Sequence, residues 1–204
     1  MAEQQPTSDL NRLENTLRRI DRENSHDPNI ERVEGVDRPR ELVYSCWLTE
    51  WVLRLCPDAS EELRLAGRCQ HLCRWMVPRD TFPMTRAGYL QWRAGLKKFH
   101  AQKAGDILLE AGYSDDTIAR VQALVLKKNF PQDPESRVLE DALCLVFLEH
   151  QFADLASRTP DDKVINALQK AWNKMTPAAQ AIATALPYTA REKALLDQAL
   201  NKPG

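Results

Sequence analysis

The sequence predicts an all-α protein, a single-domain bundle of several helices. Apolar residues recur at helical spacing along most of the chain, helix-capping residues precede these stretches, and no segment alternates apolar and polar residues as a strand would. The 204 residues are 43% hydrophobic and 28% charged, which suffices for one sizeable core. We therefore expect one helical domain over residues 9–200, preceded by a flexible N-terminus at residues 1–8.

Each predicted helix has its own start signal. Proline fits the first helical turn because that turn leaves its N–H groups unpaired, and Ser, Thr or Asp just before it can accept those N–H groups. In the first half, apolar residues at helical spacing predict a helix at 9–24, and a polar, irregular connector follows at 25–38. Pro39 starts a helix that ends at about Leu55, and an Asp58–Glu61 capping box starts one that ends at Trp75. Two prolines then predict a loop at 76–84. In the second half, Thr85 can cap a long helix to Gly112, and Ser114 can cap a helix to about Lys128. Apolar spacing predicts a helix over 135–157, and Pro160 starts a helix to Trp172. Thr176 with Pro177 starts a short helix, and Thr189 caps the last one.

Composition excludes several classes of protein. The N-terminal residues lack the basic and apolar regions of an export signal, and the longest uninterrupted apolar run, 142–148, is too short to span a bilayer. Five cysteines, an odd number within apolar helical patterns, indicate reduced thiols. We therefore expect a soluble cytoplasmic protein without a membrane partner. No glycine-rich phosphate loop, dinucleotide fingerprint or nucleophile elbow is present. The oligomeric state is not predicted.

One segment combines an apolar surface with charge. Residues 139–150 are apolar most of the way round a helix, yet they include Glu140, Asp141 and Glu149. A buried carboxylate needs a cation, a metal or a proton. Asp141 shares its helix face with two leucines, whereas Glu140 lies about 100° round the helix. We predict Asp141 as an inward-facing ligand and Glu140 as a catalytic carboxylate. Alternatively, both acids form buried ion pairs that fix helix packing.

Basic residues are concentrated between residues 63 and 103. This stretch contains nine Lys or Arg residues against one acid, Asp80, although the whole chain has 28 basic and 29 acidic residues. Arginine suits phosphate and carboxylate groups because its planar N–H groups match their oxygens. The predicted anion-binding residues are Gln70, Arg74, Arg79, Arg93 and Lys97. Alternatively, these side chains only solvate helix surfaces.

Two histidines accompany this basic stretch. His100 has apolar neighbours at helical spacing, so its ring should point toward the core. His71 lies one helix earlier, with arginines within one turn. Together with Asp141, the two imidazoles predict a site for a divalent metal of unknown identity, held by His71, His100 and Asp141. Alternatively, each is a hydrogen-bonded core histidine.

Several motifs carry a family resemblance. They are Gln-His-Leu-Cys-Arg-Trp at 70–75, Pro-Arg at 78–79, Gly-Tyr-Leu-x-Trp-Arg at 88–93, Phe-His-Ala at 99–101 and Leu-Glu-Asp-Ala-x-Cys-Leu-Val-Phe-Leu-Glu at 139–149. With these motifs the chain, from about residue 13 to 185, resembles the domain-of-unknown-function family 4202. That resemblance implies no activity.

The order of helices also resembles HD-type metal-dependent phosphohydrolases, whose ligands are a histidine, a His-Asp pair and a late aspartate. Gln70 and His71 stand at the places of the pair, and Asp141 matches the late aspartate. His100 lies on a helix similar to one that carries an accessory histidine in part of that superfamily. The early histidine is absent, with Tyr44 or Ser45 near its place. This resemblance implies an HD-domain-like arrangement.

The leading functional hypothesis is a metal-dependent phosphohydrolase of HD-like type that acts on a small phosphorylated or nucleotide substrate. The metal would activate water, and Arg74, Arg79 and Arg93 would neutralise the substrate. The rival is a non-catalytic protein whose basic helices bind an anion, RNA or an acidic partner. A third hypothesis is an HD-like iron oxygenase, because imidazole and carboxylate ligands also suit iron.

Overall fold

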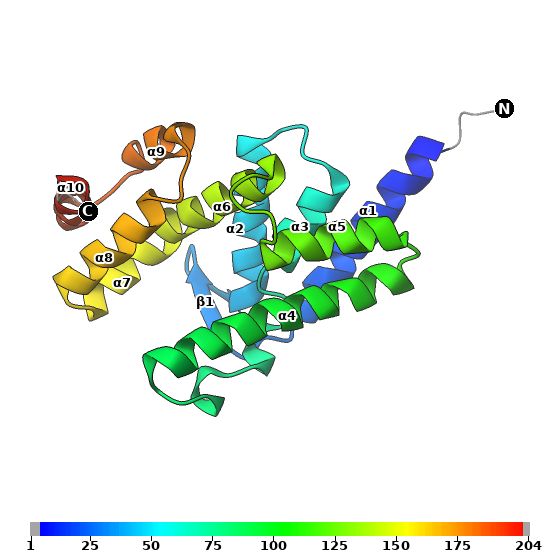
Figure 1. Ribbon diagram of the computed structural model, residues 1–204, viewed down its shortest axis with the longest axis horizontal. Helices are drawn as coiled ribbons and strands as arrows, with labels where there is room; N and C mark the ends of the chain where they lie inside the picture. Colours follow the sequence, from blue (N-terminus) through cyan, green and yellow to red (C-terminus); the bar gives the residue numbers. More distant parts are fainter. Residues whose placement is uncertain (1–4, 202–204) are drawn as a thin grey trace. The chain divides into compact units, whose positions relative to one another are not determined.

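The all-α prediction is confirmed for residues 5–201, which the computed structural model describes, with side chains from residue 11 onward (Figure 1). Ten α-helices account for most of these residues, and the sheet consists of two short strands. The residues group into two compact units, Met1–Phe130 and Pro131–Gly204. Of the segment expected to be flexible, residues 1–4 lie outside the described part, and a helix begins at Gln5. A single domain over 9–200 stays a prediction.

The first unit contains five α-helices and the strand pair. Its elements are α1 (Gln5–Asn24), β1 (Ile30–Val33), β2 (Val36–Pro39), α2 (Arg40–Leu55), α3 (Glu61–Cys69), the 3₁₀ turns η1 (Arg74–Met76) and η2 (Arg79–Thr81), α4 (Arg86–Glu110) and α5 (Asp115–Leu126). Helix α4 packs along α5, and α3 packs against both α2 and α5 (Figure 1). Fully buried leucines of α2, α3 and α4, such as Leu48, Leu63 and Leu108, form the core between them.

The connector expected to be irregular contains a β-hairpin. Strands β1 and β2 pair antiparallel, with Val33 opposite Val36. Glu34 and Gly35 both have positive φ, 51° and 80°, as a two-residue hairpin turn requires. The sequence signal was weak because glutamate rarely occupies the first of these positions and each strand has only four residues. The hairpin leads directly into α2, since the Arg40 N–H bonds the Asn29 carbonyl at 2.9 Å.

Helix α3 is shorter than predicted at both ends. Ser60, rather than Asp58, caps it by accepting the Leu63 N–H at 3.0 Å. The helix ends at Cys69 instead of continuing to Trp75, and the following turn includes Cys73 at φ 54°. Buried Asn24 holds this turn, because its Oδ1 accepts the Cys73 N–H at 3.0 Å. The turn changes the direction of the chain around His71.

The loop before α4 is fastened to the first turns of that helix. Thr85 caps α4 as predicted, accepting the Gly88 N–H at 3.1 Å. Arg79 donates to the carbonyls of Phe82 and Pro83 at 2.9 and 2.8 Å. Trp92 of α4 donates its Nε1–H to a loop carbonyl, that of Val77, at 2.9 Å. These contacts give the loop a defined conformation.

The described part of the second unit, up to residue 201, contains helices and no strand. Its elements are α6 (Pro134–Val146), a π-helical segment (Phe147–Gln151), α7 (Phe152–Arg158), α8 (Asp161–Trp172), α9 (Pro177–Thr184) and α10 (Ala190–Asn201). The single helix predicted over 135–157 is thus interrupted by one π-helical turn. Leu145, Phe152 and Leu168 are fully buried in this unit. Thr176 caps α9 as predicted, accepting the Ala179 N–H at 3.3 Å.

The cysteines and the lengths of the helices were also predicted from the sequence. The five cysteines, all among the described residues, are free thiols. None of the helices in the described part of the chain has the length and apolarity needed to cross a membrane.

Gly88 permits the close approach of the loop to α4, and a substitution can test this packing. A Cβ at Gly88 would lie 2.1 Å from the Pro83 carbonyl oxygen, so the backbone would have to shift. We expect Gly88→Ala to lower the free energy of unfolding by about 1–3 kcal/mol, measured by chemical denaturation.

Gly95 of the same helix provides the matched control. A Cβ there meets nothing closer than Phe82 Cζ at 4.0 Å. Gly95→Ala should therefore stabilise the protein by about 0.5–1 kcal/mol, because alanine is the better helix former. Equal effects of the two substitutions would contradict the close packing at Gly88.

Candidate functional site

The candidate site is centred on a carboxylate that the sequence analysis did not single out. Glu41 lies in the first turn of α2, and its side chain is buried. Its Oε2 lies 3.1 Å from His71 Nδ1, and its Oε1 lies 3.5 Å from an Arg74 Nη. Asp27 holds the start of the helix, because its Oδ2 accepts the Glu41 N–H at 2.9 Å. Both oxygens of Glu41 are therefore engaged by groups from the turn after α3.

The environment of His71 keeps the imidazole neutral. Its ring stacks on Tyr44 of α2, with centroids 4.0 Å apart and planes within 10°. Burial lowers the pKa of His71, and the hydrogen bond to Glu41 only partly offsets this effect. Burial raises the pKa of Glu41, but the bond from His71 and the charge of Arg74 lower it overall. The ionised carboxylate can only accept, so His71 donates its Nδ1–H and keeps a lone pair on Nε2.

His100 lies beside His71 and is neutral as well. It is buried on α4, as predicted, and the two ring centroids are 6.1 Å apart. Its Nδ1 lies 2.8 Å from the Leu72 carbonyl, which can only accept, so Nδ1 carries the proton. Burial is the main cause that lowers the pKa of His100 to about 3, and the neighbouring His71 ring lowers it further. Two neutral imidazoles thus have their Nδ1–H groups engaged and their Nε2 atoms as bases.

Such fixed tautomers are typical of metal-ligating histidines, so we tested the predicted ligand set. Asp141 belongs to the second unit, where its two oxygens accept the N–H and the hydroxyl of Thr176 at 2.8 and 2.6 Å. Within residues 5–201, His, Cys, Asp and Glu side chains form no group of three that could hold a metal ion. Metal binding by His71, His100 and Asp141 stays a prediction from the sequence.

Glu140 also has its partner within the second unit. It is buried, and its Oε1 lies 2.9 Å from Lys174 Nζ. Lys174 lies outside the basic stretch at 63–103. Within 139–150, Glu140 thus contacts Lys174 and Asp141 contacts Thr176.

Of the predicted anion-binding residues, Arg74 lies near His71, since both side chains contact Glu41. Its guanidinium also lies 5.1 Å from the centroid of the Trp92 ring. The charge of Lys127, at the C-terminal end of α5, likewise acts to lower the pKa of His71. Nothing in the sequence pointed to Lys127, because only tertiary packing relates it to His71.

The other predicted anion-binding residues have different surroundings. Gln70 is buried, and its Nε2 has no hydrogen-bond partner among the residues that the structure describes. Arg79 bonds loop carbonyls, and Arg93 donates to the Tyr89 hydroxyl at 3.3 Å. Lys97 is half-buried on α4.

Part of the basic excess is compensated by helix α1. Arg68 binds both oxygens of Asp21 at 2.6 and 2.8 Å, and Lys103 lies 2.9 Å from Glu23. These charges tie α1 to α3 and α4, so they serve packing in the way the alternative reading of the basic stretch expects.

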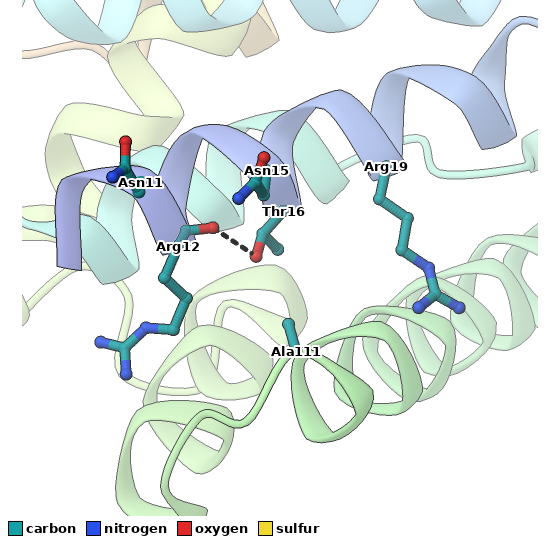
Figure 2. A pocket seen from close by; sticks show the side chains of 6 residues that line it. All are labelled: Asn11, Arg12, Asn15, Thr16, Arg19 and Ala111. Atoms are coloured by element: carbon teal, nitrogen blue, oxygen red, sulfur yellow. Dashed lines mark hydrogen bonds between the residues drawn. The ribbon is translucent and has the colours of Figure 1, made fainter. Parts of the chain in front are cut away.

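A separate open pocket of about 510 Å³ lies between α1 and the C-terminal end of α4 (Figure 2). Arg12 and Arg19 line it, together with Thr16 and Ala111. Arg19 pairs with Glu110, and Arg12 lies 4.0 Å from Glu61 and over the Tyr113 ring. Both arginines of this pocket thus have acidic partners.

Comparison with known proteins establishes the family. The family described as "Domain of unknown function (DUF4202)" matches residues 14–196, so the chain belongs to it. This confirms the first resemblance noted in the sequence. Searches of curated proteins and of solved structures found no match. The HD-type resemblance therefore stays a sequence-based expectation.

The buried neutral state of His100 predicts how stability depends on pH. Its pKa falls from the ordinary 6.5 to about 3 on folding, so between these values the unfolded chain binds the extra proton. Stability should therefore be lost as pH falls from 6.5 toward 3. Over this window, His100→Asn should lower the slope of the free energy of unfolding against pH by the equivalent of up to about one bound proton. Asparagine keeps an N–H donor for the Leu72 carbonyl. Denaturation at a series of pH values measures this slope.

The matched control is His26→Asn, which changes an exposed histidine. It should leave the slope of stability against pH as in the wild type. A slope that His100→Asn does not alter would contradict the buried neutral state of His100.

Proposed function

We propose that the protein is a hydrolase of small phosphorylated molecules in which His71 acts as the general base. The observation that carries the proposal is the Glu41–His71 pair, 3.1 Å apart, which leaves His71 Nε2 as a base next to cationic groups. A carboxylate that orients a histidine is a recurring arrangement in acid–base catalysis. The histidine must also be reachable, and the His71 side chain is 29% exposed.

The charges near His71 favour an anionic substrate. Arg74 lies 3.5 Å from Glu41 and contributes positive charge near the imidazole, as does Lys127. A phosphoryl group carries charge on several oxygens, and a guanidinium can bind two of them at once. Arg74 is therefore the expected phosphate ligand, and Lys127 adds attraction at longer range.

The proposed reaction is transfer of the phosphoryl group to water. His71 Nε2 takes a proton from water while the water oxygen forms a bond to phosphorus and the ester P–O bond breaks. The resulting imidazolium, stabilised by ionised Glu41, returns the proton to the leaving oxygen. Arg74 would stabilise the negative charge of the transferred group. Glu41 is a positioning residue, because it acts through His71.

The other hypotheses remain predictions from the sequence. The metal-dependent form of this hydrolase would use His71, His100 and Asp141, with Glu140 as a catalytic carboxylate. Binding of an anion, RNA or an acidic partner without catalysis would use the same cations. For the iron oxygenase, no observation beyond the two neighbouring imidazoles offers support.

Hydrolysis of a panel of phosphomonoesters and nucleotides tests the proposal. We expect His71→Gln to lower kcat/KM by about 10²–10⁴-fold, the usual contribution of a general base. In the wild type, the rate should fall on acidification with a midpoint below 6.5, because the pKa of His71 is lowered. Glu41→Gln should shift this midpoint to still lower pH, since Glu41 raises the pKa of His71. A merely structural role of Glu41 would not move the midpoint.

The control variant is His150→Gln. Its Nε2 lies 3.1 Å from Glu149, and the proposed reaction gives this imidazole no role, so its removal should leave the rate unchanged. Binding of phosphate compounds without turnover would overturn the proposal in favour of the binding protein.

Metal content separates the two forms of the hydrolase. We expect hydrolysis to survive chelation, with no stoichiometric metal in protein purified without chelator, as measured by elemental analysis. Near-stoichiometric metal that is lost in His100→Ala and Asp141→Ala, together with loss of activity on chelation, would contradict this expectation and support the metal-dependent form.

A further inference from the structure

A surface on the first unit combines exposed apolar side chains with arginines. We call it the apolar–basic patch; it comprises Met76, Met84, Arg79, Arg86, Tyr89, Leu90 and Arg93. Met84 is 79% exposed, Met76 59% and Leu90 57%, which is unusual for side chains of this size. The proposed hydrolysis does not use them.

The patch residues belong to the loop before α4 and to the first turns of that helix. Arg86, Leu90 and Arg93 lie at helical spacing and share one face of the helix. Arg79 reaches from the loop to within 5.9 Å of the Tyr89 ring, and Arg93 lies at the same distance from that ring. Met84 immediately precedes the cap Thr85. Thioether, aliphatic and guanidinium groups are thus exposed on one short stretch of the chain.

Arg79 holds the loop side of the patch in place. Its guanidinium donates to the Phe82 and Pro83 carbonyls, and the loop packs against Gly88 so closely that a Cβ there would clash. The loop backbone that carries Met84 therefore has a defined conformation, and a contact with it loses less conformational entropy on binding.

Charge and composition identify the kind of partner. Residues 76–93 contain three arginines and one acid, so the partner should be acidic. The stretch is rich in Met, Arg and aromatic residues and has no Lys, Glu or Ser, which is the composition of protein interfaces. A membrane-binding surface would instead be expected to have a larger cluster of Lys and Arg. Methionine adapts its shape to varied apolar anchors.

We propose that the apolar–basic patch docks an acidic, amphipathic peptide segment of another protein. Carboxylates of the partner pair with Arg86 and Arg93, and an apolar residue between them packs on Met84 and Leu90. Such a contact would bring a second protein to the unit that carries His71, independently of whether His71 is catalytic.

Selection from a displayed library of random peptides on the full-length protein tests this. The recovered sequences should be enriched in Asp and Glu that flank large apolar residues. Synthetic peptides of these sequences should bind Leu90→Ser and Arg86→Glu about tenfold or more weakly than the wild type, as expected for anchor residues. Fluorescence anisotropy measures this.

Two matched controls lie on the same helix but outside the patch. The control variants are Leu109→Ser and Lys98→Glu. Leu109 is 63% exposed and Lys98 is exposed as well. Both variants should bind the peptides as the wild type does. Recovery of no peptides, of peptides without acidic enrichment, or of peptides that bind all variants equally would overturn the proposal. Binding to phosphatidylserine vesicles that depends on Leu90 and Arg86, without peptide binding, would assign the patch to a membrane instead.

Discussion

The buried charge of Glu41 is the constraint on which the candidate site depends. A carboxylate at this depth must have its oxygens engaged, since leaving it unpaired would be strongly destabilising. His71 and Arg74 meet that need from the turn after α3. Arg74 in turn lies over Trp92, whose indole N–H is bonded to the loop before α4. One compensated charge thus connects α2, the turn after α3 and the start of α4.

Burial also decides the protonation of the two histidines. For each ring the loss of hydration is the largest influence, and it outweighs the nearby acceptors that would favour the charged form. Because those acceptors bind Nδ1, the lone pair is on Nε2 in both His71 and His100. The same arrangement suits a general base and a metal ligand. Among the described residues, His, Cys, Asp and Glu side chains form no group of three that could hold a metal ion.

The basic residues at 63–103 have different roles. Arg68 and Lys103 pair with acids of α1 and tie that helix to α3 and α4. Arg86 and Arg93 lie on an exposed helix face beside apolar side chains. Arg74, near His71, belongs to the candidate site. A count of charges along the chain cannot separate these roles, because each depends on what the fold places opposite the side chain.

By itself, the sequence determined the helical class, the family and most helix boundaries. Caps such as Thr85 and Thr176 were predictable because a cap bonds an N–H only three residues further along the chain. The inward position of His100 was likewise readable from helical periodicity. Tertiary structure alone decided the partners of the charges: Glu41 with His71, 30 residues apart, and Asp141 with Thr176, 35 apart. The physical reason is range, since periodicity and capping involve neighbours along the chain, whereas a buried charge is compensated by whichever group the folded chain brings to it.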